Sequence, residues 1–229
     1  MKTIGLIGGM SPQSTVFYYK TLNRLAKERY GGHSSAKLLL HSVNFAETHA
    51  KQIADEWDDL GAQLADAARG LERAGADLIA LATNTMHKCA PAIEAAIEVP
   101  FIHISDATAQ ALVREGHKRP ALLGTQFTME EAFYRERLAM HGLAPVVPDE
   151  GARRDIHRII FDELVHGTIN DDSRNRYIEI IKDLTASDAD SVILGCTEIG
   201  MLLNEENCAL PAYDTALLHC RTLLMQSVP

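Results

Sequence analysis

The chain has 229 residues, of which 46% are hydrophobic and 23% charged, a balance typical of a globular protein with a sizeable buried core. A formal net charge of −9 and the lack of any basic run argue against binding to nucleic acid. No apolar stretch approaches the roughly 18 residues of a membrane span, and the apolar start is too short for a signal peptide. We therefore expect a cytoplasmic protein that has no contact with a membrane.

The first half of the chain alternates between apolar runs of strand length and segments with helical spacing. The expected strands are residues 3–7, 37–45, 78–82 and 99–104. The expected helices are residues 12–30, residues 47–71 with a break at Gly61, a helix that Thr85 caps and Pro91 either kinks or delays, and a helix that Ser105 or Asp106 caps and that runs to about residue 114. This order of elements favours parallel strands joined by helices.

The same pattern then restarts in the second half. The expected strands are residues 119–124, 145–148, 191–196 and 210–215, and the expected helices are residues 128–141, 153–165, 173–186, 199–203 and 216–225. Thr128 and Glu131 fit a capping box at the start of the helix over 128–141.

Equal spacing between corresponding strand ends indicates a duplication. The distance in sequence from Gly8 to Thr83 nearly equals the distance from Gly124 to Cys196. We therefore predict an α/β protein of two pseudo-symmetric domains with parallel sheets, and an active site in the cleft between them. The expected domains are residues 1–104 and 105–210, with residues 211–229 as a segment that can pack back on the first.

A cysteine and a threonine occupy the matching strand ends. Cys196 follows an apolar run at the sheet edge where open parallel sheets bind ligands, and Thr83 holds the same place in the first half. Nearby backbone N–H groups and a helix start are expected to lower the pKa of the Cys196 thiol, although Glu198 would raise it. An inert buried thiol is the alternative for any single cysteine, and the match with Thr83 argues against it. Two proton-carrying groups on opposite sides of a cleft suit racemisation, in which a carbon atom loses a proton on one face and regains it on the other.

Small polar residues at the same strand ends predict a site for a small carboxylate. Backbone amides and hydroxyls there would hold the carboxylate and stabilise the charge that develops when the α-carbon loses its proton. The candidates are Ser11, Asn84, Thr85, Thr125 and Thr197. Gly8 and Gly9 lack the spacing of a dinucleotide site, and no lysine has a pyridoxal-phosphate context. The four cysteines are widely spaced and the histidines form no ligand motif, so we expect no cofactor and no metal.

Four motifs carry a resemblance to a known family. They are Gly8-Gly9-Met10-Ser11, Thr83-Asn84-Thr85-Met86-His87-Lys88, Leu123-Gly124-Thr125 and Gly195-Cys196-Thr197-Glu198. Over its whole length the chain resembles the aspartate/glutamate racemase family, which also contains hydantoin racemases, maleate isomerases and arylmalonate decarboxylases. The resemblance implies a homodimeric amino-acid racemase that works without pyridoxal phosphate and has one acid/base residue after the third strand of each half. Here these residues are Cys196 and Thr83, as in the branch of broad-specificity or L-aspartate/L-glutamate-specific racemases that carries threonine at the first position.

The resemblance also suggests which residues contact the substrate. They are Met10, Ser11, Gln52, Asn84, Thr85, Thr125, Thr197 and Glu198. Aspartate racemases typically hold the side-chain carboxylate with an arginine after the second strand and a lysine in the second half, and this chain has neither in those regions. Gln52 stands in the first region, either as a ligand of the substrate side chain or as a solvated helix residue. His87 and Lys88 either point into the cleft or are structural.

Other functions remain open on the sequence. A single cysteine is sufficient for a decarboxylase or for a cis–trans isomerase of small diacids. The protein can also bind an amino acid without converting it. In each catalytic case we expect Cys196 to be the reactive thiol, and Cys89, Cys208 and Cys220 to be unreactive.

Overall fold

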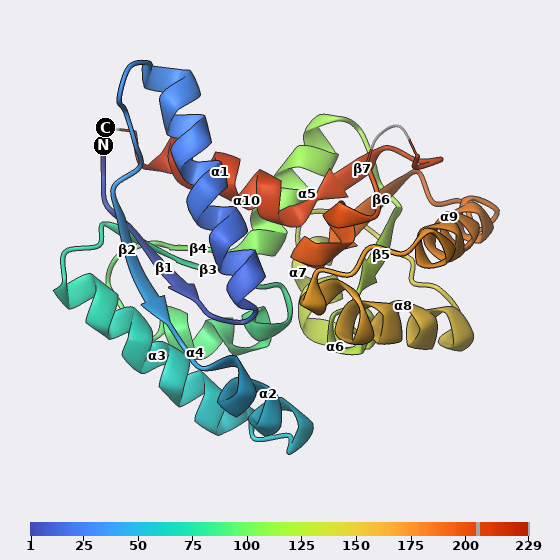
Figure 1. Cartoon of the computed structure of the whole chain (residues 1–229), viewed down its shortest axis with the longest axis horizontal. Helices are drawn as coiled ribbons and strands as arrows, with labels where there is room; N and C mark the ends of the chain where they lie inside the picture. Colours follow the sequence, from blue (N-terminus) through green and yellow to red (C-terminus); the bar gives the residue numbers. More distant parts are fainter. Residues whose placement is uncertain (205–206, 229) are drawn as a thin grey trace. The chain divides into compact units, whose positions relative to one another are not determined.

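The computed structural model describes residues 1–204 and 207–228, which form two compact units. Unit 1 holds Met1–Ile104 together with the C-terminal residues from His219 onward, and unit 2 holds Ser105–Leu218. Each unit is built on one parallel sheet with helices packed against it (Figure 1). The predicted α/β class with parallel sheets is confirmed.

The sheet of unit 1 has the strand order β2-β1-β3-β4, with all neighbours parallel. Its strands are β1 (Ile4–Gly8), β2 (Leu38–Ser42), β3 (Leu78–Leu81) and β4 (Phe101–Ile102). The central strands β1 and β3 are buried along their whole length, which explains why both are continuous apolar runs. β2 is an edge strand, and its last three residues are exposed.

The helices of unit 1 connect these strands. They are α1 (Pro12–Tyr30), α2 (Phe45–Ile53), α3 (Trp57–Arg73), the 3₁₀ turn η1 (Thr85–Cys89), α4 (Ala90–Glu94) and the start of α5 (Ile104–Arg114). Leu60, Leu64 and Leu71 recur on one face of α3 and form an apolar cluster with Ile7 of β1 and Ile79 of β3. This packing fixes α3 against one face of the sheet.

The single helix predicted over residues 47–71 is wrong. Two helices, α2 and α3, are separated by a turn in which Asp55 has a positive φ of 58°. The expected break at Gly61 does not occur. Gly61 is buried inside α3, where a Cβ atom would lie 3.2 Å from the Cβ of Ala92, so this glycine allows α3 to pack closely against α4.

The sheet of unit 2 has the strand order β5-β6-β7, again with all neighbours parallel. Its strands are β5 (Pro120–Gly124), β6 (Ser191–Gly195) and β7 (Ala212–Asp214). The helices are α5 from Ser105 onward, α6 (Gln126–Glu130), α7 (Ala132–Ala139), α8 (Glu150–Asp162), η2 (Leu164–His166), α9 (Asp171–Thr185), η3 (Thr197–Met201) and the first turn of α10 (Thr215–Gln226). The rest of α10, from His219 onward, belongs to unit 1. Within the described ranges, no helix combines the length and the apolar character needed to cross a membrane.

Three expectations for unit 2 need correction. The strand expected over residues 145–148 is reduced to one parallel bridge, between Val146 and Ala121 of β5. The capping box at Thr128 does not form, because α6 begins earlier and Thr125 is its N-cap, accepting a hydrogen bond from the Thr128 backbone N–H. Of the segment from residue 211 onward that we expected to pack with the first half, residues 212–214 pair with β6, so β7 belongs to unit 2, whereas the residues from His219 onward group with unit 1.

The two units share details beyond strand order. Ser11 is the N-cap of the helix after β1, and Thr125 is the N-cap of the helix after β5. At the amino ends of the strands, an aspartate in each unit accepts backbone hydrogen bonds from the chain just before the unit's first strand. Asp77 accepts one from Thr3, and Asp190 accepts one each from Lys118 and Arg119. These matches in position and hydrogen bonding support the duplication inferred from the sequence.

Candidate active site

The carboxyl end of β1 leads into a tight turn. Gly9 has a φ of 93°, and a Cβ atom at this position would lie 2.2 Å from the carbonyl oxygen of Val43, so only glycine fits. The Gly9 N–H donates a hydrogen bond to Thr15 Oγ1 at 2.7 Å, and Ser11 Oγ accepts one from the Ser14 N–H at 3.2 Å. The turn and the first turn of α1 are therefore held together. Met10 is buried in the core of unit 1.

The carboxyl end of β3 lies against the start of α1. Ser14 Oγ donates a hydrogen bond to the carbonyl oxygen of Ala82, the residue after β3, at 2.8 Å. Thr83 follows and is partly exposed, whereas Asn84 and Thr85 are buried. Unit 1 thus brings Ser11, through its helix, to the strand end that carries Thr83.

Gln52 also lies near this strand end. It is buried on α2, and its Nε2 is 2.8 Å from the sulfur of Met86 in η1. Its Oε1 is 3.4 Å from Nδ1 of His49 one turn earlier on α2. The interpretation of Gln52 as a solvated helix residue is therefore wrong.

His87 and Lys88 are engaged within unit 1. The His87 ring is buried, and its Nδ1 is 2.7 Å from the carbonyl oxygen of Thr83. The ammonium group of Lys88 lies over the indole ring of Trp57, 3.9 Å from its centroid. Both side chains have structural partners.

In unit 2, the carboxyl ends of β5 and β6 are adjacent. A Cβ atom on Gly195 would lie 2.6 Å from the carbonyl oxygen of Leu123, so this glycine allows the strands to lie closely together. Thr125 begins α6 at this edge, and the next N–H, that of Gln126, donates a hydrogen bond to Nδ1 of His157 on α8 at 3.2 Å. His157 is a residue that sequence reasoning missed, because nothing in the spacing links α8 to this strand end.

Cys196 follows β6 and lies beside a carboxylate. Its thiol donates a hydrogen bond to Oε2 of Glu198 at 2.9 Å, and Glu198 is only 6% exposed. Burial and the negative charge of Glu198 raise the pKa of the Cys196 thiol well above its usual value, although the backbone N–H groups of Thr197 and Glu198 act to lower it. The expectation of a lowered pKa is therefore wrong. The resting group is a neutral thiol with a proton acceptor in contact.

The other three cysteines have different surroundings. Burial raises the pKa of Cys89 to about 11, and its thiol faces the backbone oxygen of Trp57. Cys220 is fully buried in α10, and burial also raises the pKa of Cys208. Of the four thiols, Cys196 is the one that combines a strand end with a carboxylate partner.

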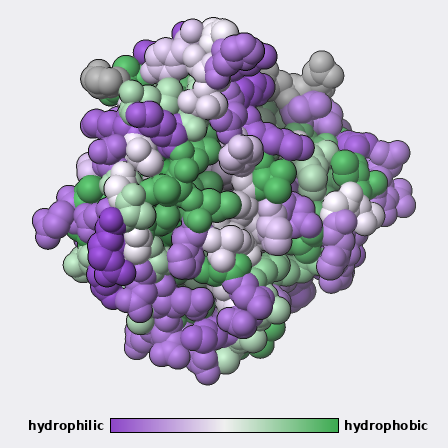
Figure 2. Space-filling view, turned by 60° about the vertical axis from the view of Figure 1, so that its left-hand side comes forward, coloured by the Kyte–Doolittle hydropathy of each residue, from purple (hydrophilic) through white to green (hydrophobic). Residues whose placement is uncertain are grey.

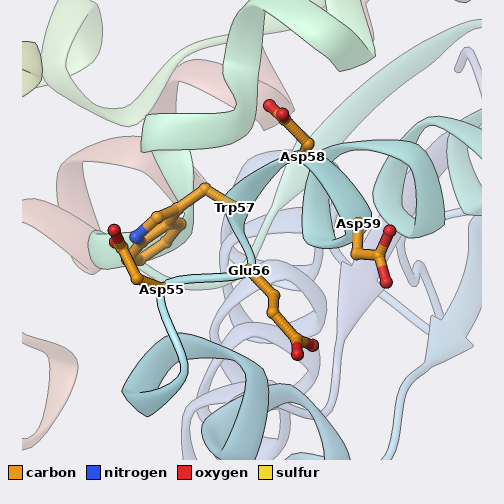
Figure 3. Close-up of a pocket in the computed structure, with 5 residues that line it drawn as sticks. All are labelled: Asp55, Glu56, Trp57, Asp58 and Asp59. Carbon is orange, nitrogen blue, oxygen red and sulfur yellow. The ribbon is translucent and has the colours of Figure 1, made fainter.

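A depression of about 350 Å³ lies elsewhere, at the turn between α2 and α3. Asp55, Glu56, Trp57, Asp58 and Asp59 line it, and Figure 3 shows the Asp55 carboxylate beside the indole ring and the other three carboxylates pointing in different directions. Four carboxylates would repel a carboxylate substrate, and none of the predicted site residues lies among them.

The chain as a whole has counterparts among known proteins. A family model described as Asp/Glu/hydantoin racemase matches residues 7–223. The chain belongs to this family. It is similar to a crystal structure of an Asp/Glu racemase candidate from Yersinia pestis, with 42% identity, a TM-score of 0.94 and full coverage of both chains. It is also similar to the structure of an aspartate racemase homologue from Pyrococcus horikoshii, with 34% identity, a TM-score of 0.88 and full coverage of both chains.

Among curated proteins, the chain is similar to the broad specificity amino-acid racemase RacX of Bacillus subtilis. The two are 24% identical over 222 residues, which cover 93% of this chain and 92% of that protein. Membership of this racemase family makes the protein an isomerase of the amino-acid racemase type. The expected family and enzyme class are thereby confirmed.

Proposed function

We propose that the protein is a racemase of aspartate, glutamate or a broader set of amino acids that works without pyridoxal phosphate. In this proposal Cys196 and Thr83 act on opposite sides of the substrate α-carbon. The observation that carries it is the Cys196 thiol, in contact with a buried carboxylate at the end of β6, where the duplicated sheet has Thr83 at the end of β3. The names of the relatives, an aspartate racemase homologue and a broad specificity amino-acid racemase, support this range of substrates.

The Cys196–Glu198 pair would allow a proton to be both donated to and removed from one face of the substrate α-carbon. As a neutral thiol, Cys196 donates its proton to a carbanion at the α-carbon and is left as a thiolate. To act as a base, it first passes its proton to Glu198 along the existing 2.9 Å hydrogen bond, and the thiolate then takes the α-proton. Glu198 thus serves the thiol, in addition to the substrate contact expected of it.

Thr83 serves the other face less well. An alcohol is a far weaker acid than a thiol, so its proton is harder to donate and its alkoxide is rarely formed. We expect Thr83 to work through its hydroxyl hydrogen, with solvent restoring the proton after each turnover. This imbalance predicts one fast and one slow enantiomer.

The substrate carboxylate has candidate partners in both units. We infer that it is held by hydroxyls and backbone N–H groups at Ser11, Asn84 and Thr85 of unit 1, and at Thr125 and Thr197 of unit 2. Gln52, buried against η1, would offer its amide to the substrate side chain. An amide in place of an arginine favours a range of side chains over strict recognition of a carboxylate.

One observation favours a second candidate function. A thiol with a raised pKa is well suited to deliver a proton to a carbanion formed by loss of carbon dioxide, and this reaction needs no group on the other face. A single-cysteine decarboxylase of small malonates is therefore the alternative to test.

We further propose that the protein is a cytoplasmic homodimer. Unit 1 leaves Val16 and Tyr19 of α1 and Leu40 of the edge strand β2 exposed, and the Leu40 side chain lies close to Gly8 at the end of β1. Figure 2 shows apolar side chains gathered on one face of the molecule, with hydrophilic ones around them. Light scattering of the purified protein should give twice the monomer mass, and a monomer at micromolar concentration would contradict this.

The test of the proposed reaction is α-proton exchange. The purified protein, without added cofactor, is incubated in deuterium oxide with L- and D-aspartate, L- and D-glutamate, and a panel of neutral and basic amino acids. We expect deuterium at the α-carbon by NMR and inversion by chiral chromatography for at least one pair of enantiomers. Release of carbon dioxide from a substituted malonate without any exchange would favour the decarboxylase, and binding without exchange would favour a binding protein.

A further inference from the structure

Three buried histidines of unit 1 form a cluster that the proposed chemistry does not use. They are His87 of η1, His103 between β4 and α5, and His219 of α10. The ring centroids of His87 and His103 are 4.4 Å apart, and those of His87 and His219 are 6.1 Å apart. At most 5% of any of the three residues is exposed.

The hydrogen bonds of His87 assign its protonation state. Nδ1 is 2.7 Å from the carbonyl oxygen of Thr83, which can only accept, so Nδ1 carries the hydrogen. Nε2 accepts a hydrogen bond from the backbone N–H of Ile104 at 3.2 Å. The ring is therefore neutral, and it bridges Thr83, two residues after β3, and Ile104, the residue at which the chain leaves unit 1.

Other rings pack around the His87 ring. His219 Nε2 donates to the carbonyl oxygen of Ile102, the last residue of β4, and its Nδ1 accepts from the Tyr18 hydroxyl, both at 2.8 Å. Burial lowers the pKa of His219 to about 4, so this ring also stays neutral near pH 7. The ring centroids of Phe101 and His87 are 5.6 Å apart, so the Phe101 ring also packs against His87. The His87 ring is thus closely packed and has little freedom to rotate.

We propose that His87 is a positioning residue for the racemase reaction, and that its ring clamps the backbone of Thr83 so that the Thr83 hydroxyl stays in line with the α-carbon. This proposal rests on the proposed function of Thr83. A weak acid contributes to catalysis only when it is held close to the atom that it protonates, because small displacements cost large factors in rate. The clamp supplies that placement from within unit 1.

Two substitutions separate the two halves of the bridge. In His87→Asn the side-chain NH₂ occupies the place of Nδ1 and keeps the hydrogen bond to Thr83, while the bond from Ile104 is lost. In His87→Gln the amide oxygen reaches the place of Nε2 and keeps the bond from Ile104, while the bond to Thr83 is lost. His219→Gln is the matched control, because it alters a buried histidine of the same cluster that has no contact with Thr83.

The variants are assayed with both enantiomers of aspartate and glutamate in deuterium oxide. We expect His87→Gln to slow inversion at least tenfold at unchanged KM, while α-proton exchange of the faster enantiomer falls less than threefold. His87→Asn and His219→Gln should each slow inversion less than threefold. Equal losses in His87→Gln and His87→Asn, or a loss shared equally by exchange and inversion, would overturn the proposal.

Backbone hydrogen exchange gives a readout that does not depend on activity. Amides of residues 83–89 should exchange faster in His87→Gln than in His87→Asn or His219→Gln, and equal protection in all three would show that no clamp exists. If the unmodified protein exchanges no α-proton, the proposed function fails, and amide exchange alone still decides whether His87 holds this segment.

Discussion

The two sheets end in the same way and present different acids. At the end of β3, Thr83 is tied through its backbone carbonyl to a buried neutral histidine. At the end of β6, Cys196 is tied through its own thiol to a buried carboxylate. In unit 1 the hydrogen bond fixes the backbone of Thr83, and in unit 2 it fixes the thiol of Cys196 itself. The duplicated fold therefore supplies equivalent positions, and under the proposed mechanism the identity and surroundings of each side chain would decide how well it transfers a proton.

Substitution of Cys196 is expected to have the largest effect on the reaction rates. Cys196→Ala should reduce both inversion and α-proton exchange at least about 1000-fold, because the variant lacks the thiol that the proposed mechanism uses as its acid and base. Chiral chromatography and NMR in deuterium oxide measure the two rates, and circular dichroism checks the fold. The matched control is Cys208→Ala, which should retain activity; undiminished activity in Cys196→Ala would refute the proposed mechanism.

The units should also differ in their response to acid. Burial lowers the pKa of His219 in unit 1 from 6.5 to about 4, so between these values the unfolded chain binds a proton that the folded chain does not. Stability should therefore be constant above about pH 6.5 and fall by up to about 3 kcal/mol as the pH drops to about 4. In unit 2, hydrogen bonds from Arg137 and His141 outweigh the effect of burial and lower the pKa of Asp106, so its contribution should persist to lower pH.

Urea unfolding at pH 7.5, 6, 5 and 4.5 measures this dependence. In His219→Gln the loss between pH 6.5 and 4 should shrink, although the variant is less stable at every pH. An unchanged slope in the variant would assign the acid sensitivity to other groups.

The next largest effect is expected when the Glu198 carboxylate beside the Cys196 thiol is removed. In Glu198→Gln the Cys196 thiol loses a neighbouring negative charge, so its pKa should fall and alkylation by iodoacetamide should accelerate at neutral pH. Racemisation should slow about 30-fold, because the amide cannot take the thiol proton. Opposite changes in alkylation and turnover are the expected signature, and a parallel change in both would show that Glu198 does not accept this proton.

A smaller effect is expected at Thr83. Thr83→Cys gives both units a thiol and should raise the rate on the slow enantiomer about tenfold, which corresponds to about 1.4 kcal/mol of barrier, with a smaller gain on the fast one. Thr83→Ala should reduce inversion and leave exchange of the fast enantiomer largely intact. If both variants behave like the unmodified protein, Thr83 takes no part, and the single-cysteine alternative is favoured.

The smallest expected effect is a loss of stability at the amino ends of the strands in the two sheets. Asp77 accepts one backbone hydrogen bond, from Thr3, whereas Asp190 accepts two, from Lys118 and Arg119, and a third from the Ser191 hydroxyl. Asp77→Ala should lower the free energy of unfolding by about 1 kcal/mol and Asp190→Ala by about 2 kcal/mol, since both sites are partly solvated. Urea titration measures the difference, activity should be unchanged in both variants, and equal losses would contradict the ranking.

Local patterns in the sequence determined much of the protein. Continuous apolar runs identify the fully buried strands β1, β3, β5 and β6, because strands buried on both faces need mainly apolar side chains. The residue after each such run is then known without any structure, and this placed Thr83 and Cys196 at corresponding strand ends. Short-range signals were less dependable, as the misplaced helix break at Gly61 and the unused capping box at Thr128 show.

Only the tertiary structure decided the environment of those residues. The hydrogen bond between Tyr18 and His219 joins positions 201 residues apart, and that between Gln52 and Met86 joins positions 34 apart. No local pattern encodes such contacts, because they arise when distant segments pack together. The raised pKa of Cys196 has the same origin, since burial depends on the whole of unit 2 and outweighs the backbone N–H groups that the local sequence does supply.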